Sequence, residues 1–139
     1  MQIPSNLSDC LVLNTVAASR ALLRRYDAQF KPFGVTVQQF ALLVAIELHP
    51  EESVAQLAKH ILLDRTSLTR NLNLLERKQL VRRANTAVGN VRYCELTEQG
   101  RALLPQLLPL WQVAQDHLVG GISAQDAATY VRIAKHLAH

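Results

Sequence analysis

Hydrogen-bonding and cationic side chains recur on one face of residues 65–79, a segment with helical periodicity. At 100° per residue this face carries Thr66, Arg70, Asn73 and Arg77, with Ser67 and Thr69 at its flanks. Arginine can donate two hydrogen bonds to guanine, asparagine can pair with adenine, and hydroxyl groups can meet base edges or phosphates. The chemistry is that of major-groove recognition. For this helix alone, a solvated amphipathic surface is the simpler interpretation.

The neighbouring segments predict how this helix is positioned. Leu68, Leu72 and Leu75 form its opposite, apolar face, and Asp64 is a suitable N-cap. A short helix precedes it, because Ser53 and Gln56 have the spacing of a capping box and are followed by an apolar stripe. A short and a longer helix joined by a tight turn are typical of a helix-turn-helix.

A predicted β-hairpin follows directly and favours the nucleic-acid interpretation. Residues 80–83 and 91–96 have strand character, with a turn over residues 84–90. A helix-turn-helix followed by a basic two-stranded ribbon is a winged helix. We expect Arg82, Arg83 and Arg92 to meet phosphates or the neighbouring minor groove, and Arg65 and Arg77 mainly to hold phosphates.

Helices are also predicted on both sides of this region. They cover residues 8–31 and 36–48 before it, and residues 97–119, which contain Pro105 and Pro109, and 123–139 after it. The predicted fold is mainly α with a small β-hairpin wing, a winged helix-turn-helix whose N- and C-terminal helices form a dimerisation region. Within one compact domain we expect residues 1–35 and 98–139 to dimerise and residues 36–97 to bind DNA.

The charge distribution points to the same central region. Residues 53–97 hold eight basic and three acidic residues, whereas the other residues hold seven basic and eight acidic ones. A basic block between nearly neutral arms indicates a polyanionic partner. Two copies of so small a module would cover a useful site, and their twofold symmetry predicts a palindromic operator.

Several function classes lack support in the sequence. No catalytic motif is evident, so we expect no enzyme, no catalytic residue and no cofactor. The five histidines are interpreted as surface residues, with no metal site. No apolar run is long enough to span a membrane and no secretion signal is evident, so a cytoplasmic protein is expected. Cys10, beside Asp9, and Cys94 are interpreted as packing residues in preference to redox sensors.

The chain resembles the MarR family of bacterial transcription regulators. The most specific stretches are residues 64–72, 75–77, 80–81 and 96–100, and the resemblance extends over residues 17–21, 26–27, 34–40 and 109–115. It implies a homodimeric repressor or activator that binds duplex DNA and is often released by a small ligand or by oxidation. Of these we expect a repressor, released by a small aromatic ligand. By resemblance, Leu13, Ala17, Phe40, Leu43 and Trp111 are candidates to line the ligand pocket.

One departure from the family keeps alternatives open. The family's wing usually carries an Asp-Arg pair near its tip, whereas residues 86–90 are uncharged. Minor-groove anchoring by the wing is therefore in question. The alternative function is a winged-helix protein-interaction module without sequence-specific DNA binding, and a third is an architectural protein that binds DNA of any sequence.

Overall fold

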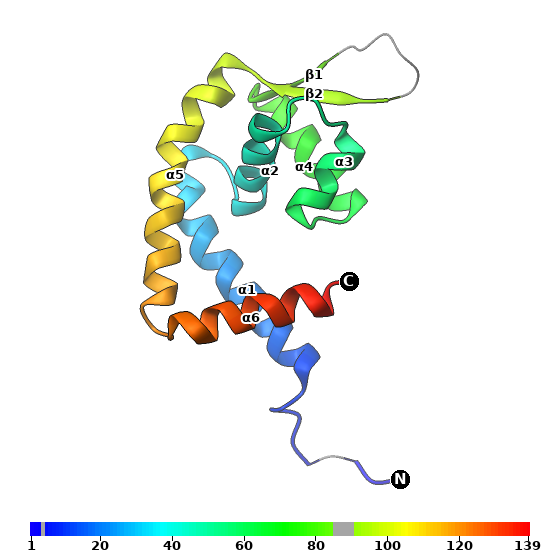
Figure 1. Ribbon diagram of the computed structural model, residues 1–139, viewed down its shortest axis with the longest axis vertical. Coiled ribbons are helices and arrows are strands. Elements are labelled where there is room, and N and C mark those ends of the chain that lie inside the picture. Colours follow the sequence, from blue (N-terminus) through cyan, green and yellow to red (C-terminus); the bar gives the residue numbers. More distant parts are fainter. Residues whose placement is uncertain (4, 85–90) are drawn as a thin grey trace.

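The described chain consists of helices and one two-stranded β-hairpin. The computed structural model describes residues 1–3, 5–84 and 91–139. Over these residues the elements are α1 (Leu11–Phe30), the 3₁₀-helix η1 (Lys31–Phe33), α2 (Val37–Leu48), α3 (Val54–Ile61), α4 (Arg65–Arg77), β1 (Val81–Ala84), β2 (Tyr93–Leu96), α5 (Glu98–Val119) and α6 (Ala124–Leu137) (Figure 1). The predicted mainly α fold with one hairpin is confirmed.

The N-caps explain where these helices begin. Thr36 and Ser53 each form a capping box with the glutamine three residues later, and the box at Ser53 was predicted from its spacing to Gln56. Thr97 and Ser123 accept hydrogen bonds from backbone N–H groups of α5 and α6. Asp64 occupies the N-cap position of α4, but its side chain makes no capping hydrogen bond. The nearby Ser67 side chain instead lowers the pKa of the Asp64 carboxyl.

The core surrounds α2. In Figure 1, α2 lies between α5 on one side and α3 and α4 on the other, with the hairpin at one end. The largest fully buried side chains come from every element of this arrangement except the hairpin's first strand: Phe30, Leu42, Leu43, Ile46, Leu57, Leu75, Leu96 and Leu107. Burial of apolar area is the main force that holds such elements together. The apolar face of α4 is therefore fixed against the body, and its polar face is turned outward.

The hairpin is shorter than predicted. Val81 pairs with Leu96 and Arg82 with Glu95 in an antiparallel register, and β1 and β2 begin one and two residues later than expected. Leu80 is used in the turn after α4, where Gln79 has a positive φ of 60°. The Val54 N–H donates to the carbonyl oxygen of Arg92, 2.9 Å away, which ties the start of α3 to the chain before β2. The predicted turn and the uncharged stretch 86–90 lie outside the described residues, apart from Ala84.

A close backbone contact explains why position 100, in the family-specific stretch 96–100, is a glycine. Gly100 lies in the first turn of α5, and a Cβ atom there would come within 2.2 Å of the Leu80 carbonyl oxygen. That same oxygen accepts a hydrogen bond from the Thr97 N–H. Only glycine leaves room for the start of α5 to pack against the turn that leads into the hairpin.

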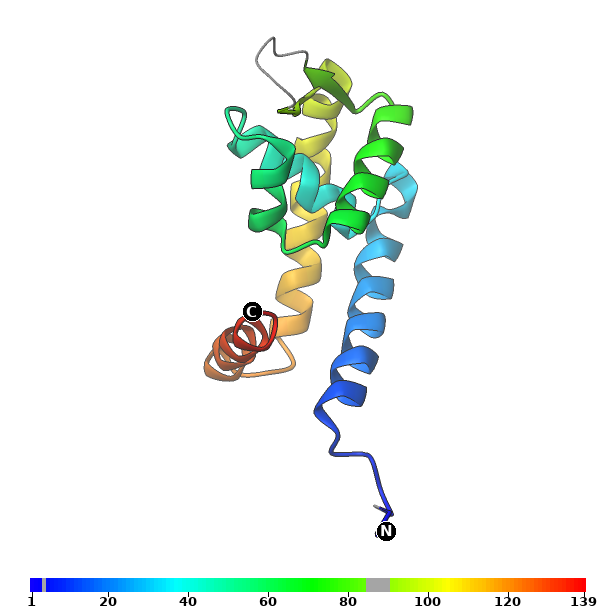
Figure 2. The ribbon, with the colours of Figure 1, turned by 90° about the vertical axis from the view of Figure 1, so that its right-hand side faces the viewer.

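The two ends of the chain extend away from this body. Figure 2 shows α1 and α5 projecting from it, with α6 turned sideways at the far end of α5. Helix α5 continues through Pro105 and Pro109, although each proline removes one backbone donor. Among the described residues, no helix combines the length and hydropathy needed to cross a bilayer. The order of α2, α3, α4 and hairpin is that of a winged helix-turn-helix.

Candidate nucleic-acid interface

The outward face of α4 forms a shallow groove. Its walls contain six of the ten residues predicted to contact DNA, together with Leu74; the six are Arg65, Thr66, Thr69, Arg70, Asn73 and Arg77. The groove has a volume of about 480 Å³, and none of the described residues that line it is acidic. The leucines on the other face are buried, with Leu68 at 2 % and Leu75 at 0 % exposure. Ser67 is half-buried at the flank, beside Asp64.

A second hollow connects this groove with the hairpin. It has a volume of about 680 Å³ and lies between the first turns of α3 and α4 and residues 91–92. Arg65 and Thr69 line both hollows, and Arg92 lies on the far wall of the second. The structure therefore brings Arg92 to the same surface as the first turn of α4, which the sequence could suggest only through the winged-helix order.

The other two wing arginines are paired with acids. The Arg83 Nε donates to Glu76 Oε2 at 2.8 Å, and Arg83 also donates from a terminal nitrogen to Asn73 Oδ1 at 2.9 Å. The Arg82 Nε donates to Glu95 Oε1 at 2.6 Å. Both pairs are partly exposed, so each adds little to stability. These ion pairs reduce the positive charge that Arg82 and Arg83 offer to a polyanion. The hydrogen bond from Arg83 also orients the side-chain amide of Asn73, because it engages the Oδ1 atom and directs the NH₂ group away from Arg83.

A buried polar network supports α4 from behind. The Gln39 side-chain amide donates to Asn71 Oδ1 at 3.3 Å, and Asn71 donates to the Ser67 carbonyl oxygen at 2.9 Å. Lys78 donates to Gln39 Oε1 at 3.1 Å and to the Gly34 carbonyl oxygen. Gln39 and Asn71 are 3 % and 5 % exposed. The network links α4 to the first turn of α2.

Sequence reasoning did not identify this network. The available signal is the position of Asn71, which at helical spacing falls among the leucines of the apolar face. A polar residue there needs a hydrogen-bond partner when the face is buried. The partner lies 32 positions earlier in the chain, and its identity follows from how α2 and α4 pack.

The structure brings together only part of the predicted ligand pocket. Phe40 and Trp111 lie close, with ring centroids 6.5 Å apart, and both line an open hollow of about 500 Å³ between α2, α3 and α5. Leu43 is fully buried in the core. Leu13 and Ala17 are exposed on α1 and do not line this hollow. Val44, Leu108, His49 and His60, none of them predicted, complete much of its wall.

The cysteines differ in their surroundings. Cys94 is buried in β2, where removal from water raises the pKa of its thiol to about 11, although Arg83 acts in the opposite direction. The thiolate is the reactive form of cysteine, so Cys94 is suited to packing and poorly suited to redox chemistry. Cys10 is half-buried at the N-cap of α1.

Two of the histidines do not behave as separate surface residues. The rings of His49 and His60 stack with their centroids 3.9 Å apart, and Glu52 forms an ion pair with His60. Neither the stacking nor the carboxylate beside it follows from residue spacing, because the three residues come from two helix ends and a turn.

Comparison with known proteins identifies the family. A sequence model of the MarR family matches residues 33–89. The transcriptional regulator MosR of M. tuberculosis, solved in complex with DNA, is 33 % identical, and the match covers 93 % of this chain and 98 % of MosR with a TM-score of 0.78. The chain therefore belongs to the MarR family.

Two less similar structures support the fold. A MarR variant from E. coli, solved in complex with operator DNA, is 23 % identical, with a TM-score of 0.78 and coverage of 96 % of this chain and 99 % of that one. BpsR of Bordetella bronchiseptica, whose DNA binding is regulated by 6-hydroxynicotinic acid, is 17 % identical, with a TM-score of 0.85 and coverage of 97 % of each chain. The winged-helix fold predicted from the sequence is confirmed. MosR is a transcriptional regulator.

Proposed function

We propose that this protein is a sequence-specific DNA-binding transcription regulator that places α4 in the major groove. The observation that carries the proposal is the groove along α4, which offers hydroxyl, amide and guanidinium groups and no acidic lining residue among those described. Thr66, Ser67, Thr69, Arg70 and Asn73 are assigned to bases and nearby phosphates. Arg65, Arg77, Arg82, Arg83 and Arg92 are assigned mainly to phosphates.

The proposal includes a homodimer that binds a palindromic operator as a repressor. It is supported by apolar side chains exposed on the first half of α1 and on α6, which a second copy would cover: Leu11, Val12, Val16, Tyr130, Val131, Ile133 and Leu137. Residues 1–35 and 98–139 then form the dimerisation region around residues 36–97. Leu107 of α5, by contrast, is fully buried in the chain's own core.

The proposed effector is a small aromatic molecule that releases the protein from DNA. The hollow between α2, α3 and α5 supports this proposal, since Phe40 and Trp111 offer two aromatic surfaces to a ligand. BpsR, which shares the fold, is regulated by a small heteroaromatic acid. Leu13 and Ala17 do not line this hollow and are not part of the proposed ligand site.

The pairing of the wing arginines favours one second candidate. Glu95 and Glu76 partly neutralise Arg82 and Arg83, so the hairpin carries less free positive charge than its sequence suggests. A winged-helix module that docks a protein in place of DNA would need no cationic wing. Binding of DNA at two salt concentrations distinguishes the two functions, because phosphate contacts release counterions and protein docking does not involve them.

The test measures binding of the full-length protein to the DNA beside its own gene, with a scrambled duplex as competitor. Arg70→Ala should reduce the preference for the specific duplex by about 1–3 kcal/mol, since it removes a base contact. Arg92→Ala, which removes an exposed cation assigned to phosphates, should weaken both duplexes about equally and make the salt dependence shallower.

The matched control is Arg24→Ala, which removes one exposed cation from the second half of α1, outside the groove along α4 and outside the exposed apolar patches of α1 and α6. It should leave both affinities within about 0.5 kcal/mol of the unmodified protein. Failure to bind any duplex at low ionic strength would refute the proposed function. Identical behaviour of Arg70→Ala and Arg92→Ala would refute the division of roles.

A further inference from the structure

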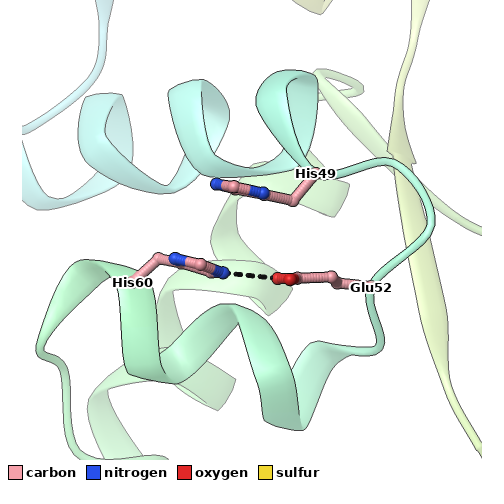
Figure 3. Close-up of side chains that lie close together, drawn as sticks. All are labelled: His49, Glu52 and His60. Atoms are coloured by element: carbon pink, nitrogen blue, oxygen red, sulfur yellow. Dashed lines mark hydrogen bonds and ion pairs between the residues drawn. The ribbon is translucent and has the colours of Figure 1, made fainter.

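Three potential metal ligands meet where α2 and α3 end on the same side of the body. His49 is the C-cap residue of α2, Glu52 lies in the turn that follows, and His60 lies in the last turn of α3. The turn is closed by the Glu52 N–H, which donates to the His49 carbonyl oxygen at 3.1 Å. One nitrogen of each histidine and one carboxylate oxygen all lie within 4.8 Å of one another. Figure 3 shows the three side chains converging from these elements.

Their mutual contacts leave part of this set without a partner. His60 Nε2 lies 2.5 Å from Glu52 Oε2, and the His49 ring lies parallel to that of His60, with 6° between the planes. Among the residues that the structure describes, none forms a hydrogen bond with the ring nitrogens of His49. An ordinary surface ion pair accounts for Glu52 and His60 alone. That pair does not explain why the His49 ring is stacked on the His60 ring.

The donor set has a recognisable chemistry. Two imidazole nitrogens and one carboxylate oxygen suit zinc and neighbouring divalent transition metals, whereas magnesium and calcium prefer oxygen ligands alone. Sites with three protein ligands leave a position open for water or another small molecule. His60 is exposed, and His49 and Glu52 are half-buried, so an ion can reach the cluster from solvent.

We propose that His49, Glu52 and His60 bind one divalent transition-metal ion of the zinc class. The ion would replace the hydrogen bond between His60 and Glu52. Around a tetrahedral zinc ion the ligand atoms lie about 3.3 Å apart, so the cluster must contract from its present spacing. The His49 ring must also turn out of the stack, because two parallel rings cannot direct their lone pairs at one point.

Such an ion would connect two structural features. It would join the end of α2 to the end of α3, the first helix of the helix-turn-helix, and thereby fix the turn over residues 49–53. Both histidines also line the hollow that contains Phe40 and Trp111, so the ion would lie at the wall of that hollow. The proposal goes beyond the proposed function and does not depend on DNA binding.

The test is calorimetric titration of the untagged, chelator-treated full-length protein with Zn²⁺. We expect saturable binding of one ion per chain, with Mg²⁺ unable to compete. His49→Ala and His60→Ala should each weaken Zn²⁺ binding at least about tenfold, since each removes a direct ligand. His136→Ala, which removes an exposed histidine from the last turn of α6, is the matched control and should bind Zn²⁺ like the unmodified protein.

A second measurement, thermal unfolding of milder variants, keeps the proposal testable if an alanine variant folds poorly. Zn²⁺ should raise the melting temperature of the unmodified protein and of His136→Ala, and this rise should be lost in the milder variants His60→Gln and Glu52→Gln. The proposal is overturned if Zn²⁺ does not bind saturably below about 100 µM, a free energy of about 5.5 kcal/mol. It is equally overturned if the His49 and His60 variants bind Zn²⁺ undiminished, or if binding is lost in His136→Ala.

Discussion

Apolar residues are buried in the winged-helix body of this chain and exposed in its end segments. In the body, which comprises α2 to α4, the hairpin and the first half of α5, leucines such as Leu57 and Leu75 are fully buried. In the end segments, residues 7–16 and 122–137, Leu11 is 71 % and Leu137 57 % exposed. Both regions have helical spacing of apolar residues in the sequence.

This difference in burial follows from which other elements of the chain pack against each region. Helix α2 packs against four other helices (α1, α3, α4 and α5) and β2, so its apolar residues are covered within the chain. The first half of α1 and all of α6 have no buried residue. An apolar surface of this extent is typical of an interaction site. The body is thus stabilised by its own chain, whereas the apolar side chains of the end segments stay exposed in the single chain.

The largest expected effect contrasts one leucine from each region. Leu75→Ala should lower the free energy of unfolding by about 2–5 kcal/mol at any protein concentration, because it opens a cavity in the body. Leu11→Ala should have its effect only at concentrations where the chain associates, because the residue is exposed in the single chain. Denaturant unfolding at several protein concentrations measures both. Equal, concentration-independent losses would remove the distinction between the two regions.

The second prediction uses the one cysteine in each region. Cys94, in the body, has a thiol pKa raised to about 11 by burial, so only about one thiol in ten thousand is ionised at pH 7. A thiol-reactive probe should label Cys10 at least about a hundredfold faster than Cys94 at that pH. Labelling of Cys94 should accelerate as the pH rises towards 11, because the thiolate then forms.

Mass spectrometry after timed labelling identifies the modified residue. Cys10→Ser is the control and should leave only the slow reaction. Equal rates at the two cysteines would show that the body does not protect Cys94.

The smallest expected effect concerns an exposed leucine within the body. Leu62 ends α3 with a φ of 56° and is 56 % exposed. Residues with a Cβ atom cost about 1–2 kcal/mol in this left-handed region, and glycine does not. Leu62→Gly should therefore raise the free energy of unfolding by about 0.5–1 kcal/mol, since glycine's greater freedom in the unfolded chain offsets part of the gain.

This outcome would separate two kinds of exposed leucine. At Leu62 the exposure follows from the geometry of a tight turn, whereas in the end segments it accompanies an uncovered surface. Urea unfolding, with Leu11→Gly as the comparison, measures the difference. A loss of stability in Leu62→Gly would mean that its side chain makes contacts that outweigh the backbone strain.

Local patterns in the sequence predicted most of the fold. The capping box at Ser53 was predicted because it involves residues only three positions apart. The two faces of α4 were predicted because helical periodicity places Leu68 and Leu75 opposite Arg70. The strand starts were misplaced by one or two residues, since the positive φ of Gln79 and the use of Leu80 in a turn leave no periodic signal.

The candidate site was predicted in part for a similar reason. The groove residues of α4 share one helix, so their spacing alone brings them together. The pairing of Arg83 with Glu76 and Asn73 joins a strand to a helix, and the support of Asn71 by Gln39 joins two helices. Neither has a spacing signature.

The sequence by itself determined the helices, their caps, the hairpin and the face of α4 that carries its polar groups, because these depend on residues within one or two turns of each other. The packing of distant segments decided the rest. It buried Leu107 and left Leu11 exposed, placed Phe40 beside Trp111 without Leu13, and stacked His49 on His60. Contacts between distant segments depend on how the whole chain packs around one core. Periodicity shows which face of a helix is apolar, but it does not show which other element will pack against that face.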